Sequence, residues 1–199
     1  MTAARSKRPP EGGRDERQIR IGISACLLGE KVRYDGGHKL AQFLIDAFGG
    51  SVEWVPVCPE VEAGFGAPRE PMQLTRAEGA IGLTMVADGR DVTAPMDEFI
   101  RQRLPELRGE TLSGYILKAN SPSCGIEGVK VHDRQGVVRE AGRGLFAEAL
   151  IREFPDLPVE DESRLSDPRL LAEFVERVFA RYRPVTSWPD SRSPRGPGC

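Results

Sequence analysis

The stretch QIRIGISACLLG, residues 18–29, decides the fold of this chain. Ile19, Ile21 and Ile23 alternate with polar or small residues, which is the period of a β-strand, and Cys26 follows where the alternation ends. The sequence therefore predicts a buried strand with a cysteine at its carboxyl end.

Two further segments repeat this arrangement. Residues 51–57 read as a strand that finishes at Cys58, and the short apolar strand 114–118 leads into ANSPSCG, which contains Cys124. The small residues around Cys124 let the backbone approach a bulky group closely. Three predicted strands thus direct three cysteines into loops.

Helical patterns separate the predicted strands. Two further strands are expected at 81–87 and 129–132, and helices at 38–48, about 95–107, 144–154 and 167–182, the last with Asp167 as N-cap. Alternating strands and helices predict an α/β fold: one Rossmann-like three-layer domain with a mainly parallel sheet and a C-terminal helix packed on it. Ligands of such sheets bind beyond the carboxyl ends of the strands, where the cysteines are expected.

Composition divides the chain into three parts. Residues 1–17 and 183–199 are rich in polar residues, proline and glycine, so we expect a disordered leader and a disordered tail that carries Cys199. Residues 18–182 form the expected single domain, which suits a chain of 199 residues.

Net charge and hydropathy restrict the classes of partner that the chain is expected to bind. The 28 Lys and Arg against 30 Asp and Glu give a formal net charge of -2, which does not favour nucleic acid or an anionic membrane as partner. No apolar run approaches the roughly 18 residues that span a bilayer, and residues 1–18 lack a signal-peptide pattern. We therefore expect a cytoplasmic protein, in which cysteines serve metal binding or catalysis rather than disulfides.

The residues alone leave the role of the cysteines open. Their spacing matches neither ferredoxin nor zinc-ribbon patterns, and free cysteines are often small buried hydrophobes. A Cys–His nucleophile is the other reading, since His38 and His132 are the two histidines of the chain. Cys199 is a poor candidate for a fourth ligand because it lies in the tail, so a cluster would keep one iron open to a small ligand.

Five segments resemble the 2-thiouracil desulfurase (TudS-like) family, formerly a domain of unknown function. They are ISACLLG (23–29), RYDG (33–36), PVCPE (56–60), GAPREP (66–71) and LKANSPSCG (117–125), in this order and with all three cysteines. The resemblance covers residues 18 to 154.

The resemblance implies an enzyme with a 4Fe–4S cluster held by Cys26, Cys58 and Cys124. The fourth iron would capture the sulfur of a thiolated pyrimidine such as 2-thiouracil, free or as a nucleoside, and a non-redox reaction would give the oxo base and sulfide. The family's assisting glutamate and serine correspond here to Glu60 and Ser121.

Other residues are expected around this site and also have simpler explanations. Arg33, Tyr34 and Asp35 can line the pocket or merely form a YDGG turn, and Glu60 can be an ordinary partner of Arg69. Ser123 can cap a turn and Lys118 can bind an anion, and either can play a purely local role.

Two alternatives to the desulfurase remain. The loop VEAGFGAPREPMQL, residues 61–74, resembles a branch usually fused to a second downstream domain, so the chain can be a non-catalytic iron–sulfur or metal-binding module that acts with a separate partner domain. Residues 142–147, GRGLFA, fit a GxGxxA nucleotide pattern, although a helix N-terminus explains them equally. The natural substrate and the oligomeric state stay open.

Overall fold

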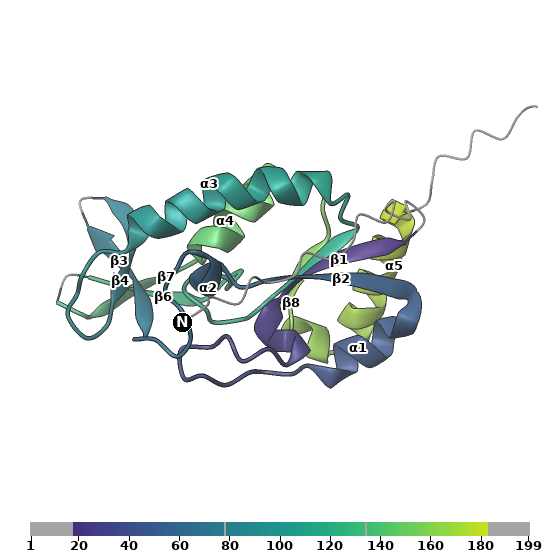
Figure 1. Ribbon diagram of the computed structural model, residues 1–199, viewed down its shortest axis with the longest axis horizontal. Helices are drawn as coiled ribbons and strands as arrows, with labels where there is room; N and C mark the ends of the chain where they lie inside the picture. The colour runs from purple at the N-terminus through teal and green to yellow at the C-terminus, as the bar shows by residue number, and fades with distance from the viewer. Residues whose placement is uncertain (1–17, 78, 134, 183–199) are drawn as a thin grey trace, which may run out of the picture.

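The central sheet has four parallel strands in the order β2-β1-β5-β8. It appears in a computed structural model that describes residues 18–77, 79–133 and 135–182 (Figure 1). The strands are β1 (Ile19–Ser24), β2 (Val52–Val57), β5 (Gly114–Leu117) and β8 (Val159–Asp161). This arrangement confirms the predicted α/β fold with a mainly parallel sheet, although the three residues of β8 were too few to be recognised.

Strand register explains why the cysteine loops meet. Ile19 pairs with Val52 and Ser24 with Val57, so β1 and β2 end level with one another. β5 lies on the other side of β1, with Ile23 opposite Ile116. The loops after all three strands therefore leave from the same edge of the sheet.

Helices cover both faces of this sheet. α3 (Thr93–Gly109) and α4 (Leu145–Glu153) lie on one face, while α1 (Gln42–Phe48) and α5 (Pro168–Tyr182) lie on the other (Figure 1). Each face has its own core, one centred on Met96, Tyr115 and Phe146 and the other on Phe174 and Val178. The predicted three layers and the packing of the C-terminal helix on the sheet are confirmed.

Two helix starts show how local hydrogen bonds set the boundaries. α1 begins at Gln42 rather than at the predicted His38, because the backbone N–H groups of Lys39 and Ala41 donate to the carbonyls of Cys26 and Leu27 (2.9 Å each). The first residues of the predicted helix are thereby held against the cysteine loop. α5 starts at Pro168 as predicted, and the Asp167 carboxylate accepts the N–H of Arg169 at 2.9 Å.

A second sheet stands apart from the first at one end of the molecule (Figure 1). Its strands, in the order β4-β3-β6-β7, are β3 (Met72–Ala77), β4 (Ala80–Met85), β6 (Val129–His132) and β7 (Val138–Gly142). These strands were not expected to form a sheet of their own, and β3 was not predicted because the preceding glycine- and proline-rich loop obscures its start. Both hairpins are antiparallel, and β3 pairs with β6 in parallel.

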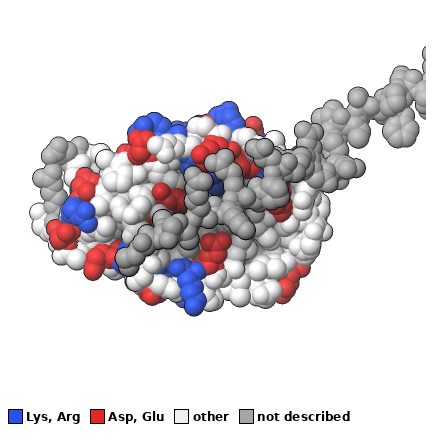
Figure 2. Space-filling view, in the orientation of Figure 1, with Lys and Arg blue, Asp and Glu red and all other residues white. Residues whose placement is uncertain are grey.

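Short helices complete the chain: η1 (Ala25–Leu28), η2 (Gly49–Ser51), α2 (Pro59–Glu62) and η3 (Arg164–Ser166). Acidic and basic side chains are interspersed on the face in Figure 2, where the described residues form no extended basic patch. Within the described residues, no helix is long and apolar enough to cross a membrane. The predicted leader, the predicted tail and Cys199 lie outside the described residues.

Candidate functional site

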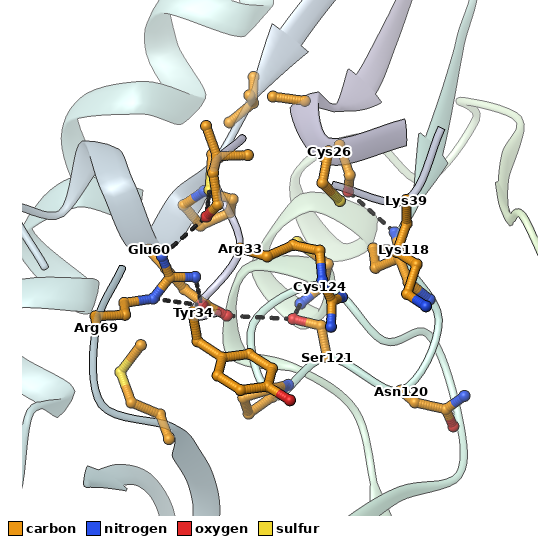
Figure 3. A pocket seen from close by; sticks show the side chains of 18 of the residues that line it. Cys26, Arg33, Tyr34, Lys39, Glu60, Arg69, Lys118, Asn120, Ser121 and Cys124 are labelled. Carbon is orange, nitrogen blue, oxygen red and sulfur yellow. Dashed lines mark hydrogen bonds and ion pairs between the residues drawn. The ribbon is translucent and has the colours of Figure 1, made fainter. Parts of the chain in front are cut away.

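Three cysteines line one cavity of about 460 Å³ at the carboxyl edge of the central sheet. Figure 3 shows two of them, Cys26 and Cys124, among the lining residues. Cys26 lies in η1 directly after β1, Cys58 precedes α2 directly after β2, and Cys124 lies in the loop after β5. Cys26 and Cys124 are buried, and Cys58 is partly exposed. The structure thus brings together the three cysteines that the sequence analysis singled out.

The Cys124 loop is held by local hydrogen bonds and close packing. Asn120 adopts the left-handed conformation (φ +61°), and the Ser121 hydroxyl accepts the backbone N–H groups of Ser123 and Cys124 at 3.1 Å each. Gly125 has no room for a side chain, because a Cβ would lie 2.9 Å from the Ser121 carbonyl oxygen. The loop is therefore a tightly defined turn.

The same loop accounts for the glycine motif at the start of α4. A Cβ on Gly144 would meet the Ser123 carbonyl oxygen at 2.5 Å, and the first helical amides donate back to this loop: Leu145 N–H to Pro122 O at 3.2 Å and Ala147 N–H to Ser123 O at 3.1 Å. These amides are engaged by protein and do not cradle a phosphate. Packing against the cysteine loop thus explains GRGLFA, and the nucleotide-binding interpretation loses its basis.

Burial keeps the three thiols neutral in the absence of metal. Burial first and the neighbouring Cys58 second raise the pKa of Cys26 to about 11, although the charges of Lys118 and Arg33 oppose the shift. Burial likewise raises the pKa of Cys58, and it raises that of Cys124 well above its usual range despite a hydrogen bond with Ser24. A metal centre here must therefore displace thiol protons when it binds.

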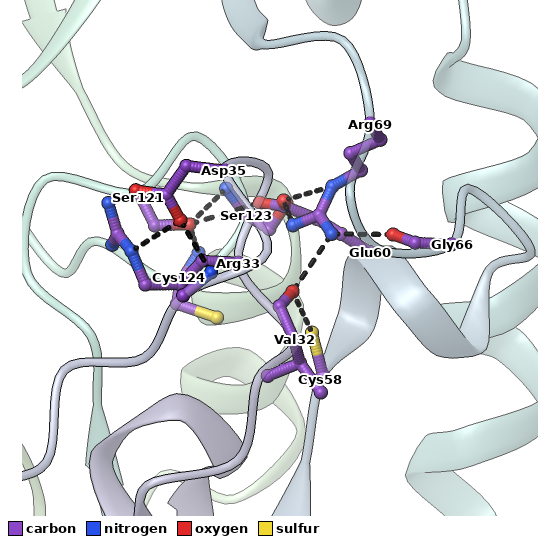
Figure 4. Close-up of polar contacts among 11 residues, drawn as sticks. Val32, Arg33, Asp35, Cys58, Glu60, Gly66, Arg69, Ser121, Ser123 and Cys124 are labelled. Atoms are coloured by element: carbon purple, nitrogen blue, oxygen red, sulfur yellow. Dashed lines mark hydrogen bonds and ion pairs between the residues drawn. The ribbon is translucent and has the colours of Figure 1, made fainter.

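Glu60 connects the Cys58 loop with the Cys124 loop (Figure 4). One carboxylate oxygen, Oε1, accepts hydrogen bonds from the hydroxyls of Ser123 (2.9 Å) and Ser121 (3.3 Å). The other, Oε2, accepts the Nε–H of Arg69 at 2.9 Å and also pairs with a terminal nitrogen of that guanidinium. Glu60, Ser121 and Arg69 all line the cavity.

The remaining predicted residues divide into two groups. Arg33 and Lys118 line the cavity, and the Lys118 ammonium is bound by the Glu162 carboxylate and by the Ala119 carbonyl oxygen at 2.9 Å. Ser123 does not line the cavity, but its hydroxyl donates to Glu60, which does. Asp35 is exposed, lies outside the cavity lining, and forms an ion pair with Arg33 at 3.4 Å.

Sequence reasoning missed several parts of the site. Lys39, Met72 and Asn120 line the cavity without having been singled out, and Glu162 holds Lys118 from the end of β8. Recognising the alternation in residues 72–77 as strand β3 would have brought Met72 to the cavity wall. The short β8 offers no comparable signal for Glu162.

Comparisons with known proteins agree with this arrangement. The family model described as 2-thiouracil desulfurase matches residues 21–162. The uncharacterized protein YbbK of Bacillus subtilis (strain 168) is 35% identical over 108 residues, which cover 52% of this chain and 71% of YbbK. A solved structure named as the 4Fe–4S-dependent thiouracil desulfidase TudS is 33% identical with a TM-score of 0.60, covering 78% of this chain and 99% of TudS. The chain belongs to the 2-thiouracil desulfurase family.

Proposed function

We propose that the protein is an iron–sulfur cluster-dependent desulfurase that acts on a thiolated pyrimidine such as 2-thiouracil. The reaction is a hydrolysis without net redox change: water replaces the ring sulfur by oxygen and leaves the oxo base and sulfide. The observation that carries the proposal is that one cavity is lined by Cys26, Cys58 and Cys124 together with Glu60 and Ser121.

The donor set fits a cluster better than a single ion. Within the described residues, no three His, Cys, Asp or Glu side chains converge closely enough to hold one metal ion. The cysteines instead border a cavity of about 460 Å³ and offer three soft sulfur ligands of the kind that iron–sulfur clusters use. We therefore assign Cys26, Cys58 and Cys124 as the ligands of a 4Fe–4S cluster.

Such a cluster, when bound with three protein ligands, supplies one open, thiophilic and Lewis-acidic iron position. The chain's own residues supply the proton transfers. Replacing sulfur by oxygen takes a proton from water and returns one to the leaving sulfur or the ring, which is a task for a positioned carboxylate. Glu60 has one oxygen on the Ser121 hydroxyl, so it can accept a proton at Oε1 while Ser121 orients the base.

The test is anaerobic reconstitution of the full chain, followed by iron and sulfide quantitation and an assay with 2-thiouracil. We expect about four irons and four sulfides per chain, as a 4Fe–4S cluster requires, together with equimolar release of uracil and sulfide. A fully active metal-free protein would overturn the proposal. A cluster without turnover would favour a non-catalytic module that needs a separate partner domain.

A further inference from the structure

Arg69 is a cation of the cavity wall with hydrogen bonds to three other residues through its guanidinium group. Its side chain is only 5% exposed, and that of its partner Glu60 is 13% exposed. The guanidinium engages Glu60 Oε2 through Nε and one terminal nitrogen, while the other terminal nitrogen donates to the carbonyl oxygens of Val32 (2.9 Å) and Gly66 (2.7 Å). All three guanidinium nitrogens are therefore committed.

These contacts join segments that are distant in the sequence. The Arg69 backbone N–H also donates to Tyr34 O at 2.9 Å. Arg69 therefore contacts the loop that follows Cys26 in the sequence at two points, Val32 and Tyr34. The carbonyl oxygen of Val32 is shared, since it accepts the Cys58 thiol at 3.7 Å as well. Arg69 thus ties the loop that follows Cys26 to helix α2, which begins directly after Cys58 and carries Glu60 (Figure 4).

The two oxygens of Glu60 are used differently as a result. Arg69 occupies Oε2, and this leaves Oε1 to the hydroxyls of Ser121 and Ser123. We call the pairing of the Arg69 guanidinium with Glu60 Oε2 the clamp. Without it, the carboxylate could rotate and exchange its two oxygens between the guanidinium and the hydroxyls. The planar guanidinium fork fixes orientation in a way that the single ammonium of lysine does not.

We propose that Arg69 is the positioning residue of this site, which holds Glu60 so that Oε1 faces Ser121 at the cavity. The inference rests on the proposed desulfurase function for its kinetic consequence, although the Arg69–Glu60 coupling can be measured without turnover. If Arg69 had a purely structural role, its replacement would instead affect only folding or cluster retention.

The kinetic experiment compares Arg69→Lys and Arg69→Gln with the matched control Arg20→Gln in the reconstituted full-length protein. Arg20 is also a largely buried arginine, 15% exposed, which pairs with Glu53 at the start of β1, away from the cavity. We expect both Arg69 variants to retain iron, sulfide and the visible absorption of the wild type. Their kcat should fall about 100-fold with little change in KM, as misplacement of a catalytic group does, and lysine should not restore it.

Chemical rescue separates positioning from structural support. Added guanidinium ion should restore part of kcat in Arg69→Ala, and ammonium at the same ionic strength should not. A loaded Arg69→Gln enzyme with wild-type kcat would overturn the proposal. Failure of Arg69→Gln to take up the cluster, where Arg20→Gln does, would also overturn it, because Arg69 would then support the cysteine loops rather than Glu60.

A double-mutant cycle keeps this inference distinct from the proposed function. Melting temperatures are measured for Glu60→Gln, Arg69→Gln and the combination, all in the reconstituted protein. Non-additive shifts, with the double variant hardly worse than either single one, would show the Arg69–Glu60 coupling that positioning requires, and additive shifts would overturn the proposal. Absence of turnover in the wild type would contradict the desulfurase alone and leave this cycle as the measure of the clamp.

Discussion

The two ends of the central sheet each contain an Arg–Glu ion pair, but the surroundings of the two pairs differ. At the amino end, Arg20 pairs with Glu53 and Glu110 and donates to the Glu110 carbonyl oxygen at 3.0 Å. Its charge is therefore paired with carboxylates of neighbouring segments. At the carboxyl end, Arg69 pairs with one carboxylate oxygen of Glu60, Oε2, and the other oxygen, Oε1, accepts the Ser123 hydroxyl beside the cavity. Both ends contain a largely buried Arg–Glu pair, and the Arg69–Glu60 pair lines the cavity that the cysteines border.

The difference lies in the loops rather than in the strands. Strand ends present backbone groups at both edges of the sheet. At the carboxyl edge, however, the loops and helix starts that follow the strands line a cavity with three thiols and Glu60, and Asn120 in one of these loops has the left-handed conformation. Ion pairs at the amino edge are expected to affect stability alone. Substitutions at matched positions of the two ends therefore test whether the carboxyl edge is the functional one.

The largest effect is expected from removal of a proposed cluster ligand. Cys58→Ser should abolish cluster uptake and desulfuration together, because a serine hydroxyl is a poor ligand for iron in a soft sulfur site. The matched control is Cys199→Ser, which changes the cysteine outside the described residues. Iron quantitation and visible absorption of both reconstituted variants give the comparison, and equal iron content in the two would contradict the ligand assignment.

Glu60→Gln should have the second largest effect. Loss of the carboxylate removes the proposed proton acceptor, so kcat should fall by about 10² to 10⁴ while the cluster is retained. It also leaves the buried Arg69 charge unpaired, which costs about 3–5 kcal/mol of the free energy of unfolding.

The matched control for this prediction is Glu53→Gln at the amino end, where the side chain is 46% exposed. It should leave kcat unchanged and stability within about 0.5 kcal/mol. Steady-state kinetics and thermal unfolding measure both quantities. A Glu60→Gln enzyme as active as Glu53→Gln would mean that Glu60 is only a structural partner of Arg69.

Most of the central sheet could be predicted from sequence because its signals are local. The alternation of Ile19, Ile21 and Ile23 and the cap at Asp167 depend on neighbouring residues, and both were placed correctly. The separate second sheet depends on pairing between distant segments: β3 meets β6 through Leu74 and Val131. No local pattern encodes that contact.

The candidate site divides in the same way. The convergence of the cysteines followed from strand ends, since parallel strands deliver their loops to one edge. The full role of Arg69 could not be predicted, because its hydrogen bonds to the carbonyl oxygens of Val32 and Tyr34 join positions that are close only after folding. Sequence suggested the Glu60–Arg69 pair but not the orientation of its two oxygens.

A smaller effect is expected from Ser123→Ala. This substitution removes the 2.9 Å hydrogen bond to Glu60 Oε1 but leaves Arg69 and Ser121 in place. Loss of one hydrogen bond to a charged group is worth about 1.5–3 kcal/mol, so kcat should fall by about 10-fold to 100-fold. Ser113→Ala, a buried serine near the amino end, is the control and should leave kcat unchanged. Equal kcat in the two variants would show that Oε1 needs only Ser121.

The smallest effect is expected from Asp35→Asn, which probes where the functional network ends. Asp35 lies outside the cavity lining, accepts the Gly37 N–H at 3.0 Å and pairs with Arg33 at 3.4 Å. The Gly37 hydrogen bond, and then Arg33, hold the pKa of this carboxyl below its usual value, so its contribution to stability is present at neutral pH and is lost as the pH falls through the lowered pKa. Exposed pairs are weak, so KM should rise less than about fivefold with kcat unchanged. A fall in kcat comparable to that of Ser123→Ala would instead extend the catalytic network from Glu60 to the exposed turn at residues 33–36.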